Sequence, residues 1–252
     1  MRGFRDLDRI LRGEATAAPA LSRDGLAVIP LAPLFAVNVL LAAWYGACMG
    51  VFGLSGRAEP EWRFMLADAV KVPLLFLLTL AVTFPSLYVF NALVGSRLGV
   101  KDLARLMAAA MGVIVAVLAA FGTIVAFFSV TTTTYPFIVL LNVAVFALAA
   151  GFGVVFLVRT LERLTAPPPP PAEVFSDVPA EAVAPRPPAA ASPSVRRVFW
   201  AWLVVFAVVG GQMSWVLRPF IGSPFKEFAW FRPREGSFFE GVMKSVRLLF
   251  GG

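Results

Sequence analysis

The chain has 252 residues, of which 59% are hydrophobic and 15% are charged, with a formal net charge of +7 and a mean hydropathy of +0.82. Soluble domains average about 45–50% apolar and about 25% charged residues, so this composition excludes an ordinary cytosolic enzyme and indicates that the solvent is lipid. The sequence contains no His and one Cys, Cys48. This argues against His-based acid–base catalysis, disulfides and zinc, haem or iron–sulfur centres, and we predict no cofactor and no metal.

The N-terminal segment, residues 1–24, predicts an amphipathic helix that lies in the membrane interface. Apolar residues fall on one side of residues 3–12 and charged residues on the other, and Asp8 and Arg12 have the spacing of an i,i+4 ion pair. The segment is rich in both Arg and acidic residues, and the apolar run that follows is too long for a signal peptide.

Four stretches carry no charged side chain: residues 25–56, 72–96, 106–158 and 198–217. A membrane-crossing helix needs roughly 20 apolar residues, so the third stretch is long enough for two helices. Four consecutive Thr residues, 131–134, and Pro136 mark the turn between them. The sequence therefore predicts an all-α fold, a polytopic transmembrane helical bundle of about five spans near 32–53, 72–95, 106–129, 136–158 and 198–217.

The predicted organisation has a four-span membrane unit over residues 25–165 and a Pro/Ala-rich, disordered linker over 166–197. The linker acts as a tether or, alternatively, as a docking strip for a partner. The fifth transmembrane segment occupies 198–222. A basic amphipathic segment, 223–252, opens its helix with a capping box at Ser237 and Glu240 and lies on the membrane surface or, alternatively, on a partner protein.

Lys and Arg counts favour a cytoplasmic N-terminus, because thirteen would lie inside and nine outside. The basic C-terminal segment counts against this orientation, since this topology places it outside. The positive charges flank the spans, where anionic lipid headgroups attract them, so we predict a lipid bilayer and no nucleic acid as the partner of this charge.

The polar side chains that stand out inside the spans are Asn38, Asn91, Asn142 and Gln212. They are predicted to hydrogen-bond between helices or, alternatively, to line a solute path. No acidic or basic residue falls in the middle of a predicted span, which counts against a proton-coupled pump. Gly46 and Gly50 form a GxxxG pattern that suits a homo-oligomer contact or close packing inside the monomer.

Several phrases resemble a group of bacterial multi-pass membrane proteins whose activity is not established. These are DLDRILRG at residues 6–13, KVPLL at 71–75, FPSLYVFNALVG at 84–95 and QMSWVLRPFIGSP at 212–224. In size and span number the chain is also similar to five-span proteins of the Yip type. The resemblance implies a bacterial source, an inner-membrane location and a shared fold, and it draws attention to Asn91, Gln212, Trp215 and Arg218. It transfers no catalytic residue.

The sequence favours a non-enzymatic membrane anchor or assembly partner that uses its ends and its linker as contact surfaces. The first alternative is a small-solute channel or carrier with a path lined by the amides named above. The second is a membrane enzyme acting on lipid, which would require polar groups such as Arg218, Arg232 and Glu235 to cluster at headgroup depth.

Overall fold

Four long apolar helices dominate the molecule. The computed structural model describes residues 2–17, 29–55, 61–93, 99–165, 193–218, 220–222, 227–233 and 236–250, and the regular secondary structure within them is helical, as predicted. Candidate membrane spans run over Leu31–Ser55, Trp62–Val89, Val100–Thr131 and Tyr135–Thr160. Such helices are consistent with a multi-pass membrane protein, because a helix pairs its backbone N–H and C=O groups internally where lipid offers no partner.

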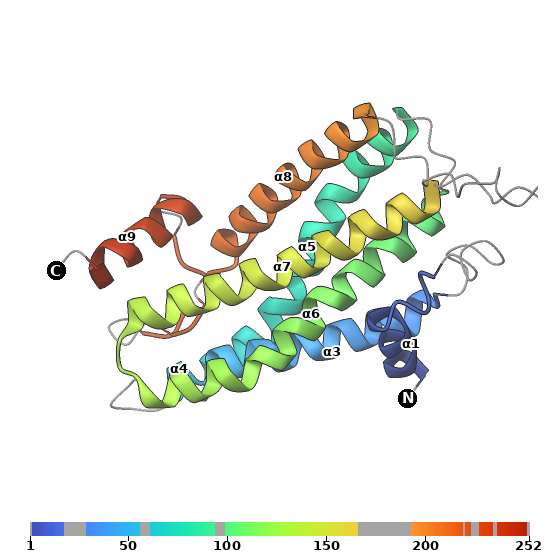
Figure 1. Ribbon diagram of the computed structural model, residues 1–252. Coiled ribbons are helices and arrows are strands. Elements are labelled where there is room, and N and C mark those ends of the chain that lie inside the picture. The colour runs from blue at the N-terminus through green and yellow to red at the C-terminus, as the bar shows by residue number, and fades with distance from the viewer. Residues whose placement is uncertain are drawn as a thin grey trace, which may run out of the picture.

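The spanning helices lie side by side as a bundle (Figure 1). They are α3 (Leu31–Gly50), α5 (Trp62–Leu93), α6 (Val100–Thr131) and α7 (Tyr135–Thr165). α3 packs against α5 and α6, and α6 packs against α7. The short α4 (Phe52–Ser55) follows α3, and α8 (Pro193–Val216) packs against α5. The helix α1 (Arg2–Leu11) sits at one end of the bundle and α9 (Phe238–Phe250) at the other.

Small side chains on α6 bring three helices together. Ala108, Ala109 and Gly112 are all buried. A Cβ at Gly112 would lie 3.0 Å from Leu7 Cδ1 and 3.1 Å from Asn38 Oδ1, so both α1 and α3 approach the α6 backbone closely there. This close approach lets the Asn38 amide donate to the Ala108 carbonyl at 2.9 Å.

The second span starts earlier than predicted, at Trp62 rather than near residue 72. The prediction treated Lys71 as the charged boundary of the span and so left both Asp68 and Lys71 outside it. The candidate span includes both, and their side chains are buried. The helix ends at Leu93, close to the predicted end at 95.

The helix α5 continues through Pro73 and Pro85. Near Pro85, the Thr83 hydroxyl donates to the Thr79 carbonyl and the Ser86 hydroxyl to the Thr83 carbonyl, both at 2.7 Å. Hydroxyl side chains thus donate hydrogen bonds to backbone carbonyls close to Pro85, a residue that has no backbone N–H.

Gly46 and Gly50 face α5 within the same chain. A Cβ at Gly46 would lie 2.2 Å from the Asp68 carbonyl oxygen, and one at Gly50 would lie 2.5 Å from Met65 Cα. The GxxxG pattern therefore serves the intramolecular alternative, a close crossing of α3 and α5.

The Thr run separates α6 from α7 as predicted, since α6 ends at Thr131 and α7 begins at Tyr135. The predicted linker, 166–197, falls outside the described residues except for 193–197, which form the start of α8. Within the described residues, the long apolar part of α8 covers Trp200–Val216 and is shorter than the four candidate spans. A fifth crossing at 198–217 remains a prediction.

Both chain ends carry helices where helices are predicted. Arg12 Nε donates to Asp8 Oδ2 at 2.9 Å, which confirms the ion pair, and the neighbouring Asp8 raises the pKa of Arg12. The capping box is confirmed too: the Ser237 N–H donates to Glu240 Oε2 at 2.9 Å, and the Glu240 N–H donates to Ser237 Oγ at 3.3 Å. α1 packs on α3 and α6, and α9 on α7 and α8.

The close crossing of α3 and α5 predicts a position-specific cost for one methyl group. Gly46→Ala forces α3 away from the α5 backbone, and we expect it to lower the free energy of unfolding in detergent by about 1–3 kcal/mol. Gly151→Ala on α7 is the matched control, because a Cβ there meets nothing within 4 Å. Equal thermal midpoints for the two variants would contradict the packing of α3 on α5.

Candidate functional site

A buried pair of opposite charges on α5 is the candidate functional site. Asp68 and Lys71 lie one helical turn apart, and their exposed fractions are 0% and 2%. Removing a charge from water costs several kcal/mol, so a buried carboxylate and ammonium persist only where hydrogen bonds and opposite charge compensate them. The two side chains are close enough to attract each other electrostatically. The groups that surround them show how the chain compensates the remaining cost of burial.

The Asp68 carboxylate binds the backbone of a distant segment. Its Oδ2 accepts the Ile221 N–H at 3.0 Å, while no hydrogen bond to Oδ1 is found within the described part of the chain. Ile221 has φ of 63°, a left-handed conformation that is a genuine outlier for a β-branched residue. Such a conformation persists where its surroundings fix it, and here the buried Ile221 side chain and the Asp68 carboxylate do so.

Two aromatic rings face the Lys71 ammonium. Nζ lies 5.8 Å from the centroid of the Phe220 ring and 5.5 Å from that of Phe231. A cation this close to a ring centroid is attracted to the ring face, and the attraction grows when water is excluded. Residues 217–218, 220–222 and 227–233, here called the C-terminal strap, thus supply partners to both charged residues.

The C-terminal strap lies over α4 and the start of α5. A Cβ at Gly222 would lie 2.8 Å from Phe64 Cγ and 3.1 Å from Gly53 Cα, so this crossing requires glycine. The rings of Phe64 and Phe228 meet edge to face at 5.1 Å between centroids. The strap is therefore packed by its own aromatic side chains as well as by the charged pair.

Arg218 and Trp215 connect the strap to both helices that flank it. The Arg218 guanidinium lies over the Trp215 ring at 4.2 Å from its centroid and donates to the Pro233 carbonyl, which closes the strap on itself. A Cβ at Gly241 of α9 would lie 2.6 Å from Trp215 Cζ3. Both residues predicted as interface positions thus contact neighbouring parts of the same chain.

The predicted intramembrane amides go to different partners. Asn38 donates to α6, whereas Asn142 Oδ1 accepts from Tyr45 Oη at 2.8 Å and Asn142 Nδ2 donates to the Ile138 carbonyl at 2.9 Å. Gln212 lies half-buried on α8, and the side chain of Asn91 lies outside the described residues. The structure thus ties Asn38 and Asn142 to separate helix contacts, in agreement with the interhelical alternative.

Sequence reasoning missed Asp68 and Lys71, although a signal was present. An acid and a base three residues apart stand between apolar residues on both sides, and this spacing places them on one helix face. The segment that binds them, by contrast, follows from no local pattern.

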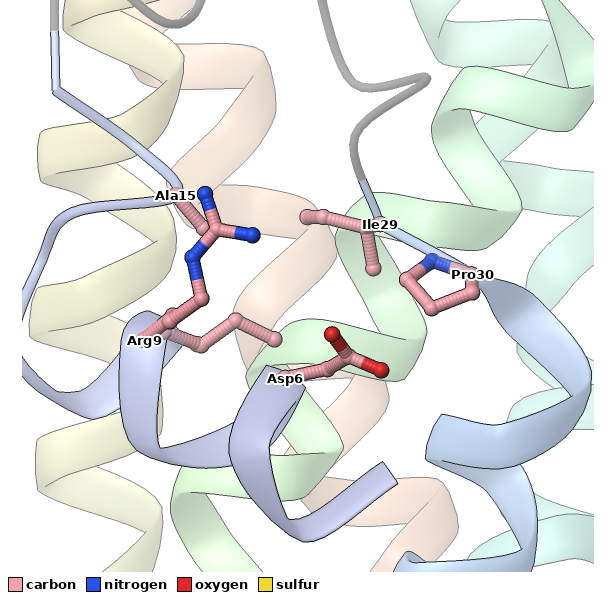
Figure 2. Close-up of a pocket in the computed structure, with 6 residues that line it drawn as sticks. Asp6, Arg9, Ala15, Ile29 and Pro30 are labelled. Atoms are coloured by element: carbon pink, nitrogen blue, oxygen red, sulfur yellow. The ribbon is translucent and has the colours of Figure 1, made fainter. Parts of the chain in front are cut away.

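A small pocket lies at the opposite end, between α1 and the residues before α3. Its lining includes Asp6, Arg9, Ile29 and Pro30, and it is too tight to admit a water molecule. Figure 2 shows the Asp6 carboxylate below Ile29 and Pro30, with the Arg9 guanidinium directed towards Ala15. The two charged side chains therefore border the pocket without closing on a common ligand position.

No family model, curated protein or solved structure matches the chain. The resemblance to bacterial multi-pass membrane proteins therefore stays a prediction, and the arguments that follow depend on the chain's own residues.

The buried pair predicts unequal effects for single and double substitutions. Asp68→Ala leaves the Ile221 N–H and the Lys71 ammonium without the carboxylate, and we expect it to lower the free energy of unfolding by about 3–5 kcal/mol. It also exposes the strap, so limited chymotrypsin digestion should cleave after Phe220 and Phe228 faster than in the unmodified protein. The double variant Asp68→Asn/Lys71→Met keeps an acceptor for Ile221 and removes both charges, and we expect near-normal stability.

The matched control for that series is Asp102→Ala. Asp102 pairs with Arg105 at 3.2 Å near the start of α6, where both side chains are partly exposed, so its loss should cost at most about 1 kcal/mol. A similar effect of Asp68→Ala and Asp102→Ala would show that Asp68 does not hold the strap.

Proposed function

We propose that the chain is an integral multi-pass protein of the bacterial inner membrane, with a non-enzymatic role as a membrane anchor or assembly partner. The observation that supports this proposal is that buried polar side chains hydrogen-bond within the chain. Asn38, Asn142 and Asp68 each hydrogen-bond to another part of the same chain. These three side chains are thus engaged in holding helices and strap together, which suits a structural element better than a solute path.

The proposed topology has five crossings, with α8 as the fifth and the N-terminus in the cytoplasm. The charge-free part of α8, residues 198–216, spans about 28 Å at ~1.5 Å per residue, close to the ~30 Å of the hydrocarbon core. The excess of Lys and Arg in the segments placed inside supports this orientation.

The charged pair then lies near the membrane boundary. The second candidate span has 28 residues, or about 42 Å, so a centred helix extends about 6 Å beyond each face of the core. Asp68 lies six residues into α5, about 9 Å from its start. This depth is compatible with a stabilising role under the strap, because the hydrocarbon centre is not reached.

A small-solute channel or carrier is the second candidate, and one observation favours it. Ionisable residues within a membrane span commonly mark substrate or ion paths, and α5 carries two that are buried, Asp68 and Lys71. Reconstituted vesicles distinguish the two functions. Solute flux that depends on the unmodified protein and is lost in Asp68→Asn/Lys71→Met, a variant expected to stay folded, would support the channel.

The assembly role is tested by cross-linking in intact membranes followed by purification in a mild detergent. We expect one companion species, a second copy or another membrane protein, in fixed stoichiometry by both methods. Gly151→Ala serves as the reference variant for folding and yield. An isolated monomer in both experiments would contradict the assembly role and leave the membrane location intact.

The topology predicts a labelling pattern for single cysteines placed in a Cys48→Ala background. With five crossings and a cytoplasmic N-terminus, a membrane-impermeant maleimide added to spheroplasts should label Thr133→Cys and Lys244→Cys but not Ala180→Cys. Labelling of 180 and 244 from the same side would show that α8 does not cross, and labelling of 180 alone would invert the orientation.

A further inference from the structure

The two end helices use their apolar sides differently. α1 buries Leu7 and Ile10 against the bundle, where Leu7 approaches Gly112 of α6. α9 has no buried residue, although it is longer and carries more aromatic side chains. On α1, Leu7 and Ile10 are therefore occupied within the chain, while Phe4 and Leu11 stay exposed. On α9 no residue is buried, so its apolar side is available to something else.

The open side of α9 is a continuous apolar strip. Phe239, Met243 and Phe250 are separated by four and seven residues, which places them on one face of the helix, with exposed fractions of 55%, 55% and 79%. These three residues are called the α9 strip below. Trp230 and Phe231 of the C-terminal strap are also exposed and precede the helix in the chain.

A second side of α9 fixes the helix to α8. Phe238 lies against Gly211, where a Cβ would be 3.2 Å from Phe238 Cδ1, and Gly241 lies against the Trp215 ring. The helix is also in contact with α7, a candidate span. The α9 strip is thus held at the end of helices whose exposed side chains are apolar, among them Val204 and Val208 of α8.

A third side of α9 carries positive charge. Glu240 is occupied by the Ser237 N–H in the capping box, and within the described residues Lys244 and Arg247 form no ion pair. By helical spacing these two basic residues lie beside the α9 strip rather than on it. An apolar face flanked by basic residues is the pattern of a helix seated at the boundary between acyl chains and anionic headgroups.

We propose that the α9 strip docks on the lipid bilayer itself, with its rings among the upper acyl chains and with Lys244 and Arg247 against anionic headgroups. This inference rests on the proposed multi-pass membrane location, which brings the bilayer next to α7 and α8. Charge complementarity favours lipid over a protein partner, because anionic headgroups supply negative charge all along the basic side. The strap determines where the strip lies, since it closes through Arg218 and Pro233 immediately before α9.

The test compares two exposed apolar residues of the same helix. Met243→Cys and Leu248→Cys, each in a Cys48→Ala background, are labelled with an environment-sensitive fluorophore, and the full-length protein is reconstituted into vesicles of phosphatidylcholine and phosphatidylglycerol. Their exposed fractions are similar, 55% and 62%, but only Met243 lies on the strip. We expect blue-shifted emission and quenching by acyl-chain spin labels at position 243, with at least threefold weaker quenching at 248.

A third label separates failure of this inference from failure of the membrane location. Phe127→Cys lies on α6, a candidate span, where Phe127 is exposed. Quenching at 127 without quenching at 243 would overturn the lipid docking alone, and blue-shifted but unquenched emission at 243 would assign the strip to a protein partner or a second copy. Absence of quenching at 127 would overturn the proposed membrane location.

A separate experiment tests the preference of α9 for anionic headgroups. We expect the double variant Lys244→Gln/Arg247→Gln to reduce quenching at 243 at least twofold in vesicles with phosphatidylglycerol and to leave it unchanged in phosphatidylcholine alone. An equal loss in both vesicles would show that the basic residues act on the fold of α9 and not on headgroups.

Discussion

Polar groups inside an apolar bundle have to find their partners within the chain, because neither lipid tails nor packed side chains supply any. Helical backbones meet this constraint for most N–H and C=O groups. Several side chains meet it as well: Asn38 reaches a carbonyl of α6, Asn142 accepts from Tyr45 of α3, and Thr83 returns to its own helix. Other buried atoms, such as Asn38 Oδ1 and Asp68 Oδ1, have no hydrogen-bond partner among the described residues. The cost of an unpaired polar group in such surroundings is several kcal/mol, so these contacts restrict which helices stand next to each other.

The same constraint acts most strongly on Asp68. A carboxylate at the end of the bundle requires donors, and α3 cannot offer its backbone because its N–H groups are used within the helix. The unwound strap can, and the Ile221 N–H reaches Asp68 at the expense of a left-handed backbone conformation. Gly222 then allows the strap to pass over Phe64, and Phe220 and Phe231 enclose Lys71. A proline follows Arg218 in the sequence and disfavours a longer α8, and the capping box at Ser237 opens α9. Between these two points, the buried charge pair supplies the contacts that hold the path of the strap.

Much of the fold was predictable because its signals are local. Charge-free stretches, the Thr run before Tyr135 and the capping box at Ser237 each depend on a few neighbouring residues, and the helices and the capping contacts follow them. The buried pair was missed because a charge-free window ends at any charged residue, whereas burial depends on what covers the helix. Here the cover is a segment 153 positions away in the chain, and only the assembled structure brings it to Asp68.

The difference between the two end helices has the same origin. Both have apolar residues at helical spacing, and spacing alone assigns both to the membrane surface. What separates them is the surface that each one meets. α1 meets the Ala-rich part of α6, where Gly112 leaves room for Leu7, so the chain itself buries Leu7 and Ile10. α9 packs on α8 through Phe238 and Gly241, which lie on a different side of the helix from the α9 strip. The strap, which joins α8 to α9, leads the chain into this packing. The strap, which the charged pair holds, and the contacts of Phe238 and Gly241 thus leave the opposite face of α9 exposed.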